Sequence, residues 1–207
     1  MTPERPIVSP EFLASVQPIV LVGGKSRRFG RDKLREPWGC VGRVLVQQPI
    51  EALRGVFGRR VKLVGACDPT VVQLADGVIP DLHPGVGPIG GIVSALAHWS
   101  GPIFVLAGDM PSFAGVEITS ILRIARMHPS AHAVCAFTDR LQPCAAMYTQ
   151  RARPSLEASI CRGDYKLLSV LDAFEVLSVP VAPEAARNIN VPIDVHQVVV
   201  QPGGLRS

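Results

Sequence analysis

The amino-acid sequence predicts an α/β fold with a mainly parallel sheet that is covered by helices. Short apolar runs rich in β-branched residues recur along the chain, and stretches with helical spacing of apolar residues lie between them. Aliphatic side chains are plentiful, whereas aromatic residues make up only 5% of the chain. This composition suits a sheet between helices better than a fibrous or disordered chain.

One domain is expected, because 207 residues fall below the size of about 250 residues at which single cores usually split. Residues 1–16 contain several prolines and are expected to form an N-terminal extension. Residues 17–207 are then the single domain.

The first half of the domain is expected to alternate between strands and helices. Short apolar runs predict buried strands at residues 19–22, 61–64, 78–80 and 103–107. Helical spacing predicts helices at residues 44–53 and 92–99.

The second half continues the pattern and adds an antiparallel strand. Strands at 133–137 and 145–148 flank a turn at 139–143, and so short a connection predicts an antiparallel pair. A further strand is predicted at 176–181, and helices are predicted at 113–127, 154–160, 165–173 and around 193–199. The core face of the first of these helices is expected to carry Val116, Ile118, Ile121, Leu122 and Ile124.

Ligands of such sheets bind beyond the carboxyl ends of the strands. The loops that follow Val22, Pro80 and Ala107 are therefore expected to converge on one crevice.

The net charge of +4 has one local concentration, formed by Lys25, Arg27, Arg28, Arg31, Lys33 and Arg35. Aromatic residues interleaved with the cations would favour single-stranded nucleic acid, but only Phe29 and Trp38 stand there. The cluster therefore favours a small phosphate ligand over nucleic acid.

The cluster lies in a glycine-rich loop, residues 21–33, directly after the first predicted strand. Glycines at this place let backbone N–H groups approach a nucleotide, and the cations can neutralise a triphosphate. The loop is not a Walker A motif, which needs glycine where this chain has Ile19, and it lacks the GxGxxG pattern. The alternative is a solvated basic loop with turn glycines.

The residues of this loop resemble the signature of the molybdenum cofactor nucleotidyltransferases, particularly the guanylyltransferase (MobA-type) branch. Phe29 stands where that family usually has methionine, a bulky apolar exchange that leaves the polar groups intact. The resemblance implies a Rossmann-like three-layer α/β/α nucleotidyltransferase fold, with the paired glycines near the base and the lysine on the phosphates. The matching positions are Leu21, Gly23, Gly24, Ser26, Arg28, Gly30, Asp32 and Lys33.

Two further segments resemble the same family. Asp81 and the run from Gly87 to Gly91 resemble a segment whose glycines make room for the nucleotide beside a helix N-terminus, and the alternative is a plain turn. Gly108-Asp109-Met110-Pro111 resembles the metal-binding motif of the family, which makes Asp109 the expected Mg²⁺ ligand. Its alternative role is the N-cap of the following helix.

Weaker matches lie in the second half of the chain. Gln142-Pro143 and the turn Arg162-Gly163-Asp164 resemble acceptor-side segments of the family. Asn188 and Asn190, in the run Asn-Ile-Asn-Val-Pro, resemble an element of the guanylyltransferases and shift the expected nucleotide toward GTP. An Asx turn before a helix is the alternative there.

These matches give a defined set of expected site residues. The catalytic residues are expected to be Lys33, Arg27 and Arg28, and Asp109 is expected to hold Mg²⁺. The nucleotide-binding residues are expected to be Leu21, Gly23, Gly24, Lys33, Asp81, Gly87, Gly91, Asp109, Asn188 and Asn190.

The resemblance implies transfer of GMP from GTP to molybdenum-molybdopterin, which forms the guanine dinucleotide cofactor and releases pyrophosphate. Handover of the product to molybdoenzymes or their chaperones stays open. The alternatives are a related nucleotidyltransferase that uses CTP or a sugar or cobinamide phosphate acceptor, and a non-catalytic nucleotide-binding adaptor.

Other features favour a cytoplasmic enzyme without a membrane partner. Five cysteines form no CxxC pair and are expected to be reduced, and no apolar run approaches the ~20 residues that cross a bilayer. The five histidines form no HExxH motif, and GxSxG is absent from the sequence. Nucleotidyl transfer to a phosphate does not depend on such groups, because the acceptor is already anionic.

Overall fold

Seven strands form one sheet in the part of the chain that the computed structural model describes, residues 8–23, 33–39 and 42–189. Their order is β3-β2-β1-β4-β6-β5-β7. Every neighbouring pair is parallel except the two that involve β6. The strands are β1 (Gln17–Leu21), β2 (Lys62–Val64), β3 (Val78–Ile79), β4 (Ile103–Ala107), β5 (Ala133–Phe137), β6 (Leu141–Tyr148) and β7 (Val176–Pro180).

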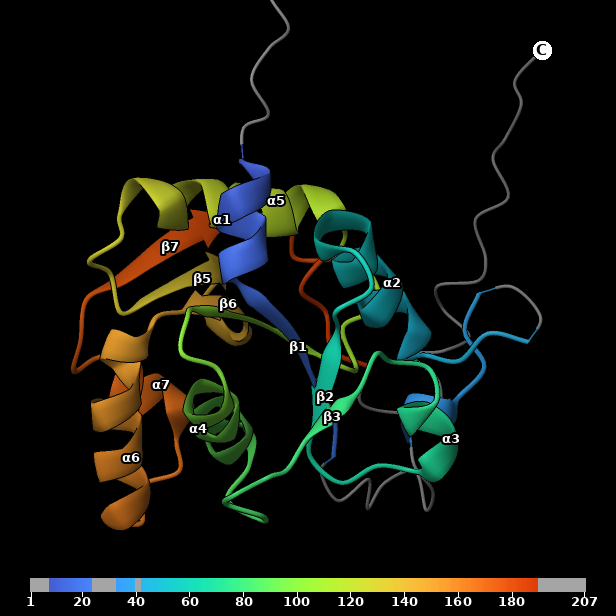
Figure 1. Cartoon of the computed structure of the whole chain (residues 1–207), viewed down its shortest axis with the longest axis horizontal. Coiled ribbons are helices and arrows are strands. Elements are labelled where there is room, and N and C mark those ends of the chain that lie inside the picture. The colour runs from blue at the N-terminus through green and yellow to red at the C-terminus, as the bar shows by residue number, and fades with distance from the viewer. Residues whose placement is uncertain (1–7, 24–32, 40–41, 190–207) are drawn as a thin grey trace, which may run out of the picture.

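Helices cover both faces of the sheet, which gives the three layers visible in Figure 1. One face carries α1 (Pro10–Ser15), α2 (Gln47–Phe57) and α5 (Gly115–Met127). The other carries α4 (Pro88–His98), α6 (Arg153–Cys161) and α7 (Leu167–Leu171). The short α3 (Pro69–Val72) follows β2, and Lys33–Arg35 and Gln150–Ala152 are single 3₁₀ turns. The predicted α/β/α class with a mainly parallel sheet and an antiparallel strand is confirmed.

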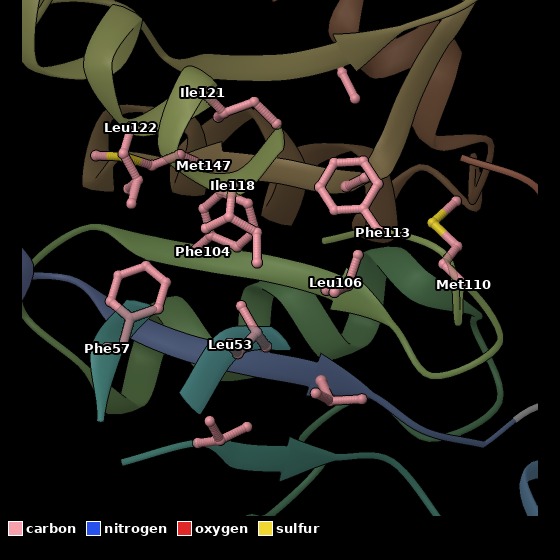
Figure 2. Close-up of a cluster of buried hydrophobic side chains, with 14 of the residues drawn as sticks. Leu53, Phe57, Phe104, Leu106, Met110, Phe113, Ile118, Ile121, Leu122 and Met147 are labelled. Carbon is pink, nitrogen blue, oxygen red and sulfur yellow. The ribbon is translucent and has the colours of Figure 1, made fainter. Parts of the chain in front are cut away.

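Two apolar cores result from the alternation of side chains along the central strands. Ile19 and Ile103 point into the core under α4, whereas Val20 and Phe104 point into the core under α2 and α5. Figure 2 shows the second core, in which Phe104 of β4 packs against Phe57 of α2 with ring centroids 5.9 Å apart. Both faces of β1 and β4 are buried, so these strands form the rigid centre of the domain.

Strand β6 is longer than expected, because it begins at Leu141 and includes Gln142 and Pro143. The register of β5 against β6 shifts between Cys135 and Ala136. Proline is tolerated at such an irregularity because the ladder needs no N–H group there. The predicted turn therefore shrinks to residues 138–140, while the predicted antiparallel pairing is confirmed.

One expectation about a helix is wrong, and one helix was not expected. Val116 lies in the first turn of α5 and is 68% exposed, so it is not part of the core face to which Ile118, Ile121 and Leu122 belong. Residues 10–15, which belong to the expected N-terminal extension, form α1, which Ser9 caps through its side chain and Pro10 begins. The helix expected around 193–199 lies outside the described residues.

Helix α1 is held to the domain by the guanidinium group of Arg60. Arg60 Nη1 donates to Ala14 O at 3.1 Å, and Nη2 donates to Leu13 O at 3.4 Å and to Val16 O at 2.5 Å. These carbonyls belong to the C-terminal end of the helix, where a cation is favourable.

Replacing Arg60 by alanine is expected to lower the free energy of unfolding by about 1–3 kcal/mol, because carbonyls at the end of α1 lose a charged donor. Urea denaturation measures this loss. The neighbouring Arg59 is the matched control, since its side chain is 83% exposed and its ion-pair contact with Asp76 is long, at 3.9 Å. Arg59→Ala should change stability by less than about 0.5 kcal/mol, and an equal loss for both variants would contradict the role of Arg60.

Candidate nucleotide-binding site

The ends of the two central strands, β1 and β4, are joined at the carboxyl edge of the sheet. The N–H group of Gly108 donates to Leu21 O at 2.9 Å. A Cβ atom at Gly108 would lie 3.1 Å from Leu34 Cδ2 and 3.2 Å from Leu21 O, so a side chain there would crowd both. Glycine thus lets the loop after β4 pass close to the segment that follows the glycine-rich loop.

This close approach brings Lys33 and Asp109 together, although 76 residues separate them in sequence. Lys33 Nζ lies 2.5 Å from Asp109 Oδ2, and the two side chains are 20% and 18% exposed. Lys33 begins the 3₁₀ turn at the end of the glycine-rich loop, and Asp109 stands two residues after the end of β4. A partly shielded lysine and carboxylate therefore meet at the strand ends.

A third chain segment completes this pair through its main chain. The N–H group of Ile189 donates to Asp109 O at 2.9 Å, and Lys33 Nζ also donates to Ile189 O at 3.2 Å. Asn188, which the sequence predicts for this site, is therefore next in the chain to a residue that contacts both Lys33 and Asp109. The sequence gives no signal for Ile189 itself, because its contacts use backbone atoms.

Asp109 does not cap the helix that follows it. Helix α5 begins only at Gly115, and its N-cap is Ala114, whose N–H group is bound by the side chain of Glu117. The alternative interpretation of Asp109 as an N-cap is therefore wrong. Its carboxylate is directed to Lys33 instead.

The loop after β2 lies against Gly23, and the sequence did not predict it as part of the site. Gly23 has a φ of +99°, and a Cβ atom on it would lie 3.0 Å from Ala66 O. Gly65 has a φ of +111°, and its Cβ would lie 1.8 Å from Val22 O. Both glycines are required for the two loops to touch. Residues 65–66 are thus neighbours of the predicted nucleotide loop, and the one hint in the sequence was a glycine directly after a short strand.

The segment before α4 carries three of the expected residues in different settings. Asp81 Oδ1 accepts from the N–H group of His83 at 2.9 Å and from Ser94 Oγ at 3.3 Å, which fixes the turn to the helix. Gly87 is the N-cap of α4, with a φ of +82° and no atom within 4 Å of a Cβ position. Gly87 therefore borders open space.

Gly91 differs from Gly87, because the space of its missing side chain is filled by protein. A Cβ atom on Gly91 would lie 2.8 Å from Leu21 Cδ2 and 3.4 Å from Val64 Cγ1. Glycine at this position lets α4 pack closely on β1 and β2. Its contact with Leu21 links the helix to the residue that starts the nucleotide loop.

Cys144, in β6, lies near the carboxylate of Asp109. Desolvation of the sulfur, and secondarily the negative charge of Asp109, raises the pKa of the Cys144 thiol to about 12. The thiol therefore stays protonated and neutral at physiological pH. It adds no charge to the pair formed by Lys33 and Asp109.

Several expected site residues fall outside the described part of the chain. They are Gly24, Arg27, Arg28 and Asn190.

On the expected acceptor side, Gln142 Nε2 donates to Thr138 Oγ1 at 2.9 Å. Arg162 and Asp164 border a cavity of about 200 Å³ between α6 and α7.

Within residues 8–23, 33–39 and 42–189 no three His, Cys, Asp or Glu side chains form a group suited to a metal ion. Asp109 offers a single carboxylate. This suits an ion such as Mg²⁺, which binds one or two protein carboxylates and takes its other ligands from phosphates and water.

No helix among the described residues is long and apolar enough to cross a bilayer.

Replacing Gly65 by alanine is expected to weaken nucleotide binding by at least about tenfold, since even small displacements of positioning groups are costly. The new Cβ would collide with Val22 O and push the end of β1 away from the loop after β2. Calorimetric titration with a magnesium–nucleotide complex measures the effect. Gly58→Ala is the control, because Gly58 also has a positive φ (+74°) but no atom within 4 Å. Equal affinity of the Gly65 variant and the wild type would refute the proposed contact between the two loops.

Known proteins resemble this chain in sequence and in fold. The chain is 34% identical over 169 residues to a probable molybdenum cofactor guanylyltransferase of Pyrococcus furiosus, a match that covers 78% of this chain and 82% of the relative. It is 33% identical over 127 residues to the molybdenum cofactor guanylyltransferase of Xanthomonas euvesicatoria, and that match spans 60% of each chain.

A solved structure is similar over nearly its whole length. The molybdopterin-guanine dinucleotide biosynthesis protein A of Archaeoglobus fulgidus superposes with a TM-score of 0.70 at 30% identity, covering 87% of this chain and 95% of that one. The family of MobA-like NTP transferase domains matches residues 18–178, which include every strand from β2 to β6 and the pair Lys33 and Asp109. The chain belongs to this family of nucleotidyltransferases.

Proposed function

We propose that the protein transfers GMP from GTP to molybdenum-molybdopterin cofactor and releases pyrophosphate. The single observation that carries this proposal is the contact between Lys33 and Asp109 at the carboxyl edge of the sheet, 2.5 Å apart. It joins a group suited to phosphates and a group suited to a divalent cation in one place. The names of the similar relatives support GTP as the nucleotide and the molybdopterin cofactor as the acceptor.

The glycine-rich loop and the loop after β2 would hold the nucleoside part of GTP. Gly23 and Ala66 are in close contact, and Gly87 borders open space at the start of α4. The base would lie near Gly23, and the phosphates would extend toward Lys33. Arg27 and Arg28 would add positive charge to the triphosphate.

Lys33 and Asp109 would exchange partners when the substrate binds. Without substrate each neutralises the charge of the other, and the two partly buried groups are thereby stabilised. Asp109 would hold Mg²⁺, whose positive charge neutralises phosphate oxygens. Lys33 would then turn to the β- and γ-phosphates, while its contact with Ile189 O keeps the ammonium group near the strand ends.

The reaction is an in-line displacement at the α-phosphorus of GTP. A terminal phosphate oxygen of the acceptor forms the new P–O bond, and the bond to the β-phosphate breaks. The electron pair leaves with pyrophosphate, whose charge Lys33 would stabilise. No general base is needed, because the attacking phosphate is already an anion. A cytoplasmic location supplies GTP, and the product, being a cofactor, would pass to a molybdoenzyme or its chaperone.

Purified protein, acceptor, Mg²⁺ and each NTP in turn should give pyrophosphate release with GTP only. Lys33→Ala and Asp109→Asn should each lower the rate by about 10²–10³, the usual cost of one charge-stabilising contact. The matched controls are Lys62→Ala and Asp172→Asn. Lys62 begins β2, at the opposite end of the strand from the site, and donates to Asp76 O, and Asp172 is exposed at the end of α7.

Full turnover with GTP in both site variants would refute the assignment of the site. Turnover with CTP in place of GTP would refute the nucleotide. Binding of GTP without release of pyrophosphate, in the presence of acceptor, would favour a non-catalytic adaptor instead.

A further inference from the structure

Ile189 contacts both partners of the candidate active site through its backbone. Its N–H group donates to Asp109 O at 2.9 Å, and its carbonyl accepts from Lys33 Nζ at 3.2 Å. An ammonium group has three donors. Of these, one is directed to Asp109 Oδ2, a second to Ile189 O, and the third can meet a phosphate.

The side chain of Ile189 is anchored apart from the two main cores. It is 1% exposed and packs with Trp38 and Leu45, which are 7% and 0% exposed. In the described part of the chain, these three residues form a separate buried cluster. This cluster of Ile189, Trp38 and Leu45 is therefore separate from the packing of the helices on the sheet.

The partners of Ile189 belong to the segment that starts at Lys33. The N–H group of Trp38 donates to Arg43 O at 3.1 Å, and that of Leu45 donates to Glu36 O at 2.8 Å. An isolated bridge joins Pro37 and Val44. This small hairpin is in turn tied to the 3₁₀ turn of Lys33, because the N–H group of Val46 donates to Leu34 O at 3.2 Å. A closed path of contacts thus runs from Lys33 through the hairpin to Ile189 and back to Lys33.

We propose that Ile189 is a positioning residue, which aims Lys33 at the departing pyrophosphate by holding its own carbonyl in place through the cluster with Trp38 and Leu45. The inference rests on the proposed function, since it concerns the same lysine. When the carboxylate of Asp109 is engaged by the metal, Ile189 O is the partner that stays with Lys33 Nζ. A neutral carbonyl orients the ammonium group without cancelling its charge.

A double-mutant cycle with Lys33 tests this role, because a residue that acts through Lys33 matters only while Lys33 is present. Ile189→Ala should lower kcat by about 10- to 100-fold in the wild-type background, the cost of a misplaced catalytic group. KM for GTP should change by less than about threefold, because the lost contribution acts on the charge that develops on the leaving group. In the Lys33→Ala background the same substitution should change kcat by less than about twofold.

Ile121→Ala is the matched control, since Ile121 is also fully buried but lies on α5 in the core shown in Figure 2. It should reduce the melting temperature and change kcat by the same small factor in both backgrounds. Ile189→Val keeps the branched side chain and should retain kcat within about threefold, because the loss is one methylene.

Fluorescence gives a readout that does not need turnover. The chain has two tryptophans, so Trp99→Phe leaves Trp38 as the single emitter. In that background Ile189→Ala should shift the emission of Trp38 to longer wavelength and increase its quenching by acrylamide, whereas Ile121→Ala should do neither.

The outcomes separate this inference from the proposed function. If the wild type releases no pyrophosphate with GTP, the proposed function fails, and the inference that rests on it fails with it. If the wild type turns over GTP but Ile189→Ala lowers kcat equally with and without Lys33, or behaves as Ile121→Ala does, Ile189 is structural and the inference alone is overturned.

Discussion

The contact between Lys33 and Asp109 is the interaction on which the candidate site depends. Each group is about one-fifth exposed, so each relies on the other for neutralisation while no substrate is bound. The pair holds a lysine and a carboxylate at the place where a triphosphate and a divalent cation would bind. When the substrate binds, Asp109 would pair with the cation and Lys33 with the phosphates, so that both charges stay neutralised.

The sheet provides the rigid frame for this contact. Strands β1 and β4 are central, parallel and buried on both faces, so the loops that follow Leu21 and Ala107 leave the same edge side by side. Glycine at position 108 lets these loops approach, and glycine at 65 does the same for the loop after β2. Close backbone contacts fix the relative positions of Gly23, Lys33 and Asp109.

The central strands, and the place of Asp109 just after β4, could be predicted because their signals are local, as a short apolar run followed by glycine and a carboxylate. Ile189 and residues 65–66 could not, since they contribute backbone atoms, and any residue carries those. Val116 was misplaced because a residue two positions before Ile118 lies about half a turn away from it, on the opposite side of the helix. Helix α1 was missed although Ser9 and Pro10 form a readable cap. The sequence did not predict that Lys33 pairs with Asp109. It placed both residues on the same bound nucleotide but gave no sign of a contact between them.

The central claim is that Lys33 and Asp109 are partners in the free protein and separate on the substrate. A crystal structure with Mg²⁺ and a GTP analogue that cannot be cleaved between the α- and β-phosphates tests it most directly. The account predicts the metal on Asp109, the ammonium group of Lys33 on the β- or γ-phosphate, and the contact of Lys33 with Ile189 O retained. A nucleotide bound elsewhere, or bound at this edge with the ion pair of Lys33 and Asp109 intact, would contradict it.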